Sequence, residues 1–407
     1  MNQLLKELRH GPLFWLLAFV PVVLVCENLK PEAHTLLFVL SVLAIVPLAA
    51  LLSRATESVA VKTGDTVGGL LNATLGNLTE LVIALTALAA GQYTLVKASI
   101  AGAIVTNTLF MLGAAFLLGG LKHHVQEFNP ANARLQAMQL FLATIALLVP
   151  SAVGRADSAS TAVFTQHLSL CLALLLIATY GLGLFFSLKT HPELFRGVGH
   201  AEAEGAPWPI GLALATLGGV TVLVALVSEI FVESVQEAAV SMGMTQAFVG
   251  FIVVSLVGAA AEMASAFSGA RKNRLDLSVG IALGSAAQIA LFVAPVLVLA
   301  SYVIGPSPMD LQFWPGAVVM TLFATITTSL ICNSGRSSWF SGVLVLGVYL
   351  VFAITLYLLP PAGPPPTLPG AESQISPGIR VPVLRGFPTL VADGEIPELR
   401  ASTIPLR

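Results

Sequence analysis

Long apolar stretches, separated by short polar or Gly/Pro-rich breaks, run along most of the chain. A helix needs about 20 mostly apolar residues to cross ~30 Å of hydrocarbon, so stretches of this length predict membrane-spanning helices. The pattern is met by eleven candidates, at residues 12–27, 34–53, 67–90, 95–119, 135–152, 166–187, 208–230, 246–269, 276–302, 313–332 and 339–359. We therefore predict an all-α membrane protein with about 11 transmembrane helices.

The two halves of the chain resemble each other at a fixed offset. A shift of 182 positions superposes Gly76 on Gly258, Glu80 on Glu262, Gly102 on Gly284 and Phe110 on Phe292. Each half would contain five helices, and an odd number of crossings turns the second half upside down relative to the first. The predicted organisation is an N-terminal transmembrane helix (1–33), a first five-helix repeat (34–190), a cytoplasmic linker (191–207), a second inverted five-helix repeat (208–359) and a Pro-rich disordered tail (360–407).

Lysine and arginine positions predict the orientation, because cytoplasmic loops of membrane proteins carry an excess of both. With a cytoplasmic N-terminus, only Lys30 and Arg155 among the scored residues fall outside. The inner side would carry Lys6, Arg9, Arg54, Lys62, Lys122, Arg134, Lys189, Arg196, Arg271, Lys272, Arg274 and Arg336. This bias favours a plasma membrane, and the absence of a long regulatory N-terminal extension favours a bacterial inner membrane over a vacuole.

Composition excludes several classes of function. Hydrophobic residues make up 56% of the chain and charged residues only 10%, and the net charge is -2, so no basic surface for nucleic acid is expected. The chain has no GxxxxGK[ST] loop, no HExxH and no GxSxG. We therefore expect neither an enzyme nor a cofactor. The lipid bilayer is the expected surrounding, and assembly into a homo-oligomer stays open.

Glu80 and Glu262 are the leading candidates for function. Each lies near the middle of an apolar span, where an ionised side chain is unfavourable by about 2.5 kcal/mol or more and usually faces a cavity or a partner. They also occupy matched positions of the two halves. Oxygen-bearing side chains near them could complete a shell around a hard cation, with backbone carbonyls exposed where Gly76 or Gly258 loosens the helix. These metal-ligand candidates are Asn77, Thr106, Asn107, Ser285 and Gln288.

Two carboxylates in a cavity of low dielectric constant are compensated by one divalent cation or by two protons. Competition between these occupants amounts to exchange, and Glu80 and Glu262 would then also couple proton movement. Three further acids near the predicted mouths, Glu57, Glu229 and Glu233, could attract cations or could equally be solvated charges.

At these residues the sequence resembles the cation/proton exchanger (CAX) branch of the calcium/cation antiporter superfamily, over about residues 34–359. The segments similar to its two signatures are 54–58 and 67–81 in the first half and 228–229, 272–277 and 284–295 in the second. The second signature usually reads Gly-Asn-Ala-Ala-Glu-His, whereas residues 258–263 read Gly-Ala-Ala-Ala-Glu-Met. The resemblance implies an eleven-helix Ca²⁺/H⁺ antiporter that works by alternating access, in which Glu80 and Glu262 bind calcium and protons alternately.

Two alternatives remain open from the residues. Ala259 and Met263 in the second signature suggest exchange of another cation, such as Na⁺, K⁺ or Mn²⁺. A passive cation channel could also use paired acidic residues, and its calcium flux would need no proton counterflow.

Overall fold

The computed structural model describes residues 12–153, 159–192 and 207–359. Its first half contains η1 (Pro12–Ala18), α2 (Phe19–Leu29), α3 (His34–Thr63), α4 (Asp65–Leu75), α5 (Leu78–Ala89), α6 (Tyr93–Val105), η2 (Thr106–Met111), α7 (Leu112–His123), β1 (Val125–Glu127), α8 (Pro130–Val153), α9 (Ala159–Phe185) and η3 (Phe186–Thr190). Its second half contains α10 (Ile210–Ser241), α11 (Gln246–Phe248), η5 (Val249–Val254), α12 (Ser255–Gly258), α13 (Ala260–Arg271), α14 (Leu275–Gln288), η6 (Ile289–Val293), α15 (Ala294–Ala300), α16 (Pro315–Cys332), β2 (Arg336–Ser338) and α17 (Trp339–Leu358). Most of the predicted linker and the whole predicted tail lie outside the described residues.

The all-helical prediction is confirmed, whereas the helix count stays a prediction. In the described part of the chain, 8 helices are long and apolar enough to cross a membrane, or up to 10 if each bent pair is one span. The first expected span corresponds to a shorter apolar helix, Leu13–Leu29. Helix α3 runs ten residues beyond its expected end, because residues 54–63, which include several polar side chains, continue the helix past the apolar stretch. The short antiparallel pair β1–β2 was not predicted.

Equivalent elements recur in the two halves at the predicted offset. Helices α5 and α13 span residues that lie 182 positions apart at both ends, and the π-helical turns η2 and η6 interrupt equivalent long helices. Equivalent helices also pack against each other in opposite directions. Thr35 at the start of α3 bonds Ser241 at the end of α10 over 2.7 Å, and the Trp208 amide, just before α10, donates to Ser58 near the end of α3.

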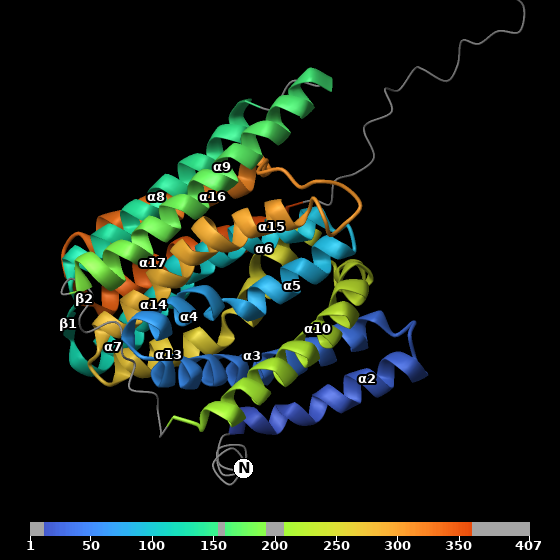
Figure 1. Ribbon diagram of the computed structural model, residues 1–407, viewed down its shortest axis with the longest axis horizontal. Helices are drawn as coiled ribbons and strands as arrows, with labels where there is room; N and C mark the ends of the chain where they lie inside the picture. The colour runs from blue at the N-terminus through green and yellow to red at the C-terminus, as the bar shows by residue number, and fades with distance from the viewer. Residues whose placement is uncertain (1–11, 154–158, 193–206, 360–407) are drawn as a thin grey trace, which may run out of the picture. The chain divides into compact units, whose positions relative to one another are not determined.

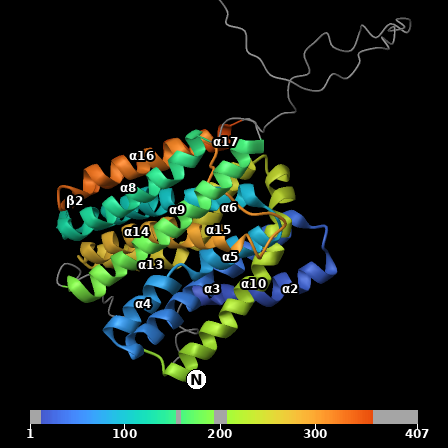
Figure 2. The same cartoon turned by 45° about the horizontal axis from the view of Figure 1, so that its top comes forward.

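The second antiparallel pair of equivalents is formed by α8 and α16. Arg134 donates to the Asn333 carbonyl at one end, and Thr144 bonds Thr325 over 2.9 Å in the middle. Figure 1 shows α5, α6, α14 and α15 between this pair and the group α2, α3 and α10, and Figure 2 shows α8 and α16 side by side. Helix α5, which carries Glu80, is therefore enclosed by longer, continuous helices.

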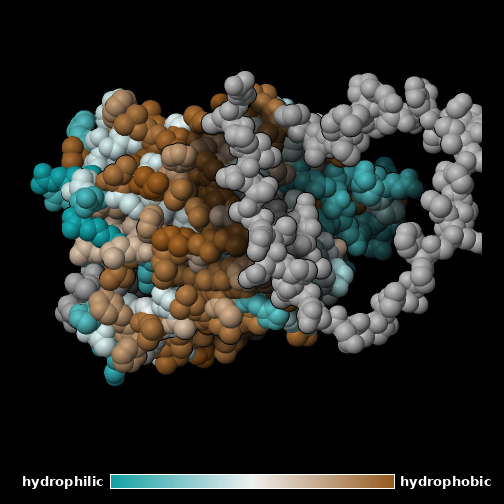
Figure 3. All heavy atoms as spheres, turned by 90° about the horizontal axis from the view of Figure 1, so that it is seen from above, coloured by the Kyte–Doolittle hydropathy of each residue, from teal (hydrophilic) through white to brown (hydrophobic). Residues whose placement is uncertain are grey.

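The outer surface matches a lipid environment. Many large hydrophobic side chains are exposed, among them Leu182 at 70% and Val240 at 75%. Figure 3 shows them as a broad hydrophobic band, with hydrophilic side chains gathered toward its ends. Exposed apolar patches of this extent are unfavourable in water and mark contact with a membrane or a partner. The chain is an integral, multi-pass membrane protein.

Candidate functional site

Glu80 lies in the first turn of α5, directly after a break in its membrane span. Helices α4 and α5 meet at an angle of 42°, and Asn77 between them has a backbone ψ of 35°, outside the helical range. Gly76 ends α4, so the break falls where the sequence predicted a loosened helix. The first turn of a helix carries unpaired N–H groups and a partial positive charge, which favour a carboxylate there.

Glu262 occupies the equivalent place in the second half. It lies in the first turn of α13, and the bend between the Gln246–Gly258 segment and α13 is 60°. Ala259 stands at this break with a backbone ψ of 6°. The last carbonyls of a helix lack intrahelical partners in general, so carbonyl oxygens near each break are candidate ligands beside the carboxylate.

The two breaks face each other across the halves of the protein. A methyl group added at Gly258 would lie 2.9 Å from Glu80 Cγ and 3.4 Å from Glu80 Oε1, so the first carboxylate rests against the second break. The charges of Glu80 and Glu262 interact directly. Among the described residues, Glu80 Oε1 and Glu262 Oε2 are buried and have no hydrogen-bond partner. Buried acceptors without donors are satisfied by a cation, by protons or by ordered water.

A hydrogen-bonded cluster of three predicted ligands lies beside Glu262. Asn107 Nδ2 donates to Ser285 Oγ over 2.7 Å, and Ser285 Oγ donates to Asn77 Oδ1 over 2.7 Å. Ser285 lies close to Glu262, but its one hydroxyl hydrogen is donated to Asn77. Asn107 Oδ1 is buried and unpaired within the described part of the chain. The cluster therefore presents an oxygen acceptor next to the carboxylates.

The remaining predicted ligands are near the breaks but in different contacts. The Gln288 side-chain amide lies beside Gly76, where an added methyl would be 3.2 Å from Gln288 Oε1. Thr106 instead bonds Ser255 over 2.9 Å and approaches the Tyr349 hydroxyl at 3.5 Å. Tyr349 was missed by sequence analysis. Its polar group gave little signal, because the largely apolar helix α17 also carries Ser341, Thr355 and Tyr357.

A small cavity adjoins Glu80. Its volume is about 20 Å³, which is enough for a single water molecule, since about 10–15 Å³ suffices. It is lined by Glu80, Ile83, Ala84, Ser99, Ile100, Ala103, Val254, Ser255, Gly258, Ile289 and Val293. Ser99 and Ser255 bring hydroxyl groups to this cavity, although neither was among the predicted ligands. Small polar residues such as these also occur at ordinary helix contacts in membranes, so the sequence alone does not single them out.

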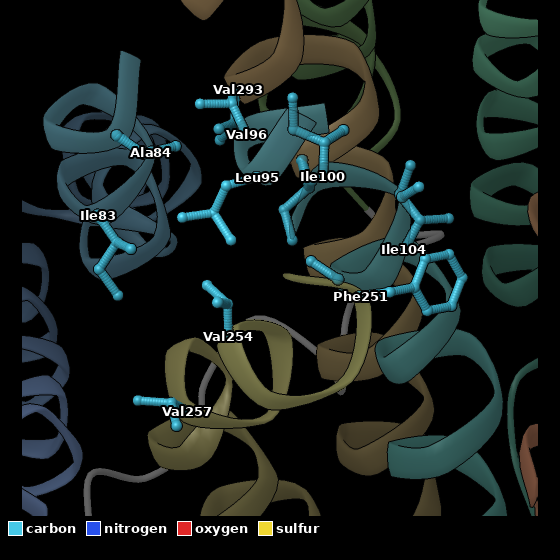
Figure 4. Packing of buried hydrophobic residues seen from close by; sticks show 14 of the residues in the cluster. Ile83, Ala84, Leu95, Val96, Ile100, Ile104, Phe251, Val254, Val257 and Val293 are labelled. Carbon is cyan, nitrogen blue, oxygen red and sulfur yellow. The ribbon is translucent and has the colours of Figure 1, made fainter. Parts of the chain in front are cut away.

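Access to the carboxylates differs between the two sides. Beyond Glu80, toward the end of α5, the buried side chains of Ile83, Leu95 and Val254 close the space with their neighbours (Figure 4). The α4 half of the first broken helix is loosely packed by comparison. Val67 of α4 is 51% exposed, whereas the equivalent Val249 is fully buried. The exposure of Val67 alone does not open the site, and the opposite side holds a cavity of about 330 Å³ lined in part by Gly91, Leu95 and Val249.

The proposed entry residues lie away from the breaks. Glu57 is not at a helix end, because α3 continues to Thr63, and its carboxylate lies 3.7 Å from Arg54. Glu229 and Glu233 are exposed on α10, which also continues beyond both of them. The negative charges of both repel that of the Glu27 carboxylate in α2. No group of three His, Cys, Asp or Glu side chains able to hold a metal occurs in the described ranges, so a metal site here would need amide, hydroxyl or backbone oxygens beside two acids.

Comparison with known proteins gives consistent matches. The family model described as sodium/calcium exchanger protein matches residues 33–189 and 212–358. A Ca(2+)/H(+) antiporter of Aphanothece halophytica is 40% identical over 362 residues, which cover 85% of this chain and 96% of the relative. The Ca(2+)/H(+) antiporter ChaA of Bacillus subtilis is 37% identical over 341 residues, covering 82% of this chain and 95% of that relative. The solved structure of native YfkE is similar with a TM-score of 0.73 and 36% identity, covering 85% of this chain and 100% of that one.

Proposed function

We propose, from the premise that this chain belongs to the sodium/calcium exchanger protein family, that it exchanges Ca²⁺ for protons across a membrane by alternating access. The observation that carries the proposal is the meeting of two helix breaks, each with a buried carboxylate in the following turn. Relatives named as Ca(2+)/H(+) antiporters support the choice of ions. Transport of this kind involves no catalytic residue and no bound cofactor.

The chemistry of exchange follows from charge balance at Glu80 and Glu262. When both carboxylates are ionised and no cation is bound between them, the pair is unfavourable in a site of low dielectric constant. One Ca²⁺ neutralises both charges, and two protons do the same, so the two occupants exclude each other. Calcium takes six to eight oxygen ligands at about 2.3–2.6 Å. We assign the further ligands to Asn77, Thr106, Asn107, Ser285, Gln288 and backbone carbonyls at the breaks.

The proposal includes a location and an orientation. We place the protein in a bacterial inner membrane with a cytoplasmic N-terminus, so that the basic loops lie inside. The α4 side of the site would then face the cytoplasm. Glu229 and Glu233 would attract cations to the outer mouth, and Glu57 would do so at the inner one.

A flux assay in proteoliposomes tests the proposal. A pH gradient should drive uptake of radioactive Ca²⁺, and Glu80→Gln or Glu262→Gln should abolish it, because either change removes one charge and one titratable group. Glu127→Gln is the matched control, since this glutamate is 69% exposed and pairs with Arg336 on the surface. Gradient-driven uptake that survives both buried substitutions would refute the assignment.

A different cation is the second candidate. Ala259 and Met263 are buried in an apolar cluster, so the second break offers no amide or imidazole group of its own. Fewer ligands favour a less demanding ion, such as Na⁺, K⁺ or Mn²⁺. Competition by each ion for Ca²⁺ uptake separates these cases, and calcium flux without proton movement would indicate a channel.

A further inference from the structure

The interface between α8 and α14 contains two polar side chains that the ion site does not use, Asn132 and Gln136, and it ends at Gln288, one of the assigned Ca²⁺ ligands. Gln136 of α8 points at α14, where its Nε2 lies 3.6 Å from the position of an added methyl on Gly284. Gly284 precedes Ser285 of the hydrogen-bonded cluster and lies one turn before Gln288. Gly280, one turn earlier, also lacks a side chain. At these two positions no side chain of α14 stands between the two helices.

Three polar atoms along these two helices are buried without partners in the described structure. They are Asn132 Oδ1, Gln136 Oε1 and Gln288 Nε2. Asn132 is only 4% exposed and Gln288 only 7% exposed. Most buried polar groups in proteins have a hydrogen-bond partner, and ordered water supplies it where side chains do not. Water can donate to the two carbonyl oxygens and accept from the Gln288 amide, so its two roles match all three atoms.

The spacing of these amides suits a file of water molecules. Asn132 and Gln136 are four residues apart on one face of α8, so they are separated by about 6 Å along the helix axis. Gly284 and Gln288 have the same spacing on α14. One water bridges such a step, because hydrogen bonds between oxygens are about 2.8 Å long. The file would run from one helical turn to the next.

The two ends of this interface differ in character. At one end the Asn129 amide donates to the Asp276 carboxylate, close to the loop that carries Arg271, Lys272 and Arg274. At the other end Gln288 reaches Gly76 at the first helix break. The α8–α14 interface thus connects the basic end of the protein with the depth at which the carboxylates lie.

We propose that the α8–α14 interface is the inner proton path, a file of water held by Asn132, Gln136 and Gln288 and separate from the route that Ca²⁺ takes along α4. This inference rests on the proposed exchange. A proton leaves a carboxyl group when its O–H bond breaks, joins the nearest water, and emerges as hydronium at the basic end while Ca²⁺ takes its place between the carboxylates. Amides order the water but do not ionise, so they hold no proton themselves.

Calcium is poorly suited to this path. A desolvated Ca²⁺ needs several oxygen ligands at once, including carboxylates. Between the two ends of the interface the described side chains offer neutral amides, and the Asp276 carboxylate at its mouth is already held by a backbone amide. A hydronium ion needs only three acceptors and moves by passing its proton onward, so a narrow file of water conducts it.

Two flux measurements on the full-length protein in proteoliposomes test this path. One is Ca²⁺ uptake driven by a pH gradient, and the other is Ca²⁺/Ca²⁺ counterflow at equal pH, which requires no net proton movement. We expect Gln136→Leu, which keeps the side-chain size, to slow gradient-driven uptake at least tenfold and to change counterflow less than twofold. Gln136→Asn, which retains a carbonyl oxygen, should restore much of the gradient-driven rate.

The matched control is Gln139→Leu, one turn further along α8. Its amide points at Gly183 of α9 instead of α14, so both fluxes should stay normal. Equal loss of both fluxes in Gln136→Leu, or loss of neither, would overturn the proton path. Wild-type protein that shows counterflow but no gradient-driven uptake would instead overturn the exchange reaction itself.

Discussion

The contact between Gly258 and Glu80 predicts a large effect from a single methyl group. In Gly258→Ala the new carbon would lie 2.9 Å from Glu80 Cγ, whereas carbon atoms in contact are normally about 3.5–4.0 Å apart. Glu80 must therefore retreat by at least about 0.6 Å, which is the difference between these two distances. The clash involves Cγ near the base of the side chain, so the whole carboxylate moves with it.

This displacement is large on the scale of calcium coordination. Protein oxygens bind Ca²⁺ within a window about 0.3 Å wide, from ~2.3 to ~2.6 Å. Misplacement of a reacting group by ~1 Å costs about a hundredfold in well-organised sites. We therefore expect the KM for Ca²⁺ to rise at least tenfold in Gly258→Ala, equivalent to about 1.4 kcal/mol or more of lost binding.

Calcium uptake into proteoliposomes at several Ca²⁺ concentrations measures this change. Gly218→Ala in α10 is the control, because an added methyl there meets no atom within 4 Å and alanine is the better helix former. Size-exclusion profiles and thermal unfolding of both variants establish that they fold. A folded Gly258→Ala protein with the wild-type KM would show that the position of Glu80 does not set calcium affinity.

Three further predictions concern other parts of the protein. Ser285→Ala removes the hydroxyl that bridges Asn77 and Asn107. The loss of a buried hydrogen bond worth about 1 kcal/mol predicts a roughly fivefold higher KM for Ca²⁺, and an unchanged KM in flux assays would contradict this. Glu233→Gln should lower kcat/KM for Ca²⁺ about twofold at low ionic strength and have little effect at high salt, because salt screens the long-range attraction of exposed charges. A loss that does not depend on salt would argue for direct binding of Ca²⁺ by Glu233. Thr325→Val removes a hydrogen bond between α8 and α16, so thermal unfolding in detergent should show a loss of about 1 kcal/mol of stability while transport stays normal. Loss of transport at full stability would contradict a purely structural role.

Sequence reasoning predicted the centre of the candidate site from the acids in two apolar spans, because an acid there is costly and rare. Glu80 and Glu262 stood out for that reason, and their matched positions exposed the repeat. The breaks at Gly76 and Gly258 were also predictable, since glycine weakens a helix. Helix length was predicted less well. The expected span of α3 ended with its last apolar residues, because only apolar stretches were taken to cross the hydrocarbon, whereas the helix continues through Glu57.

Contacts between distant segments were beyond sequence reasoning. Ser285 bonds Asn77 across 208 positions and accepts from Asn107 across 178, and a pattern within one helix carries no information on such partners. The π-helical turns η2 and η6 were missed for a related reason. One inserted residue per turn leaves the apolar pattern almost unchanged, although it redirects the side chains at a functional site.

The two halves share a backbone plan but not the surroundings of their carboxylates. The equivalents of Asn77 and Ser285 in the other half are Ala259 and Ala103, so the hydrogen-bonded cluster has no symmetric copy. One carboxylate therefore lies beside a hydroxyl group, whereas the other rests against Gly258 and a small cavity. We therefore expect an ion held between the breaks to take its side-chain amide and hydroxyl ligands mainly from the cluster of Asn77, Asn107 and Ser285, so that the site is asymmetric although the backbone plan is repeated.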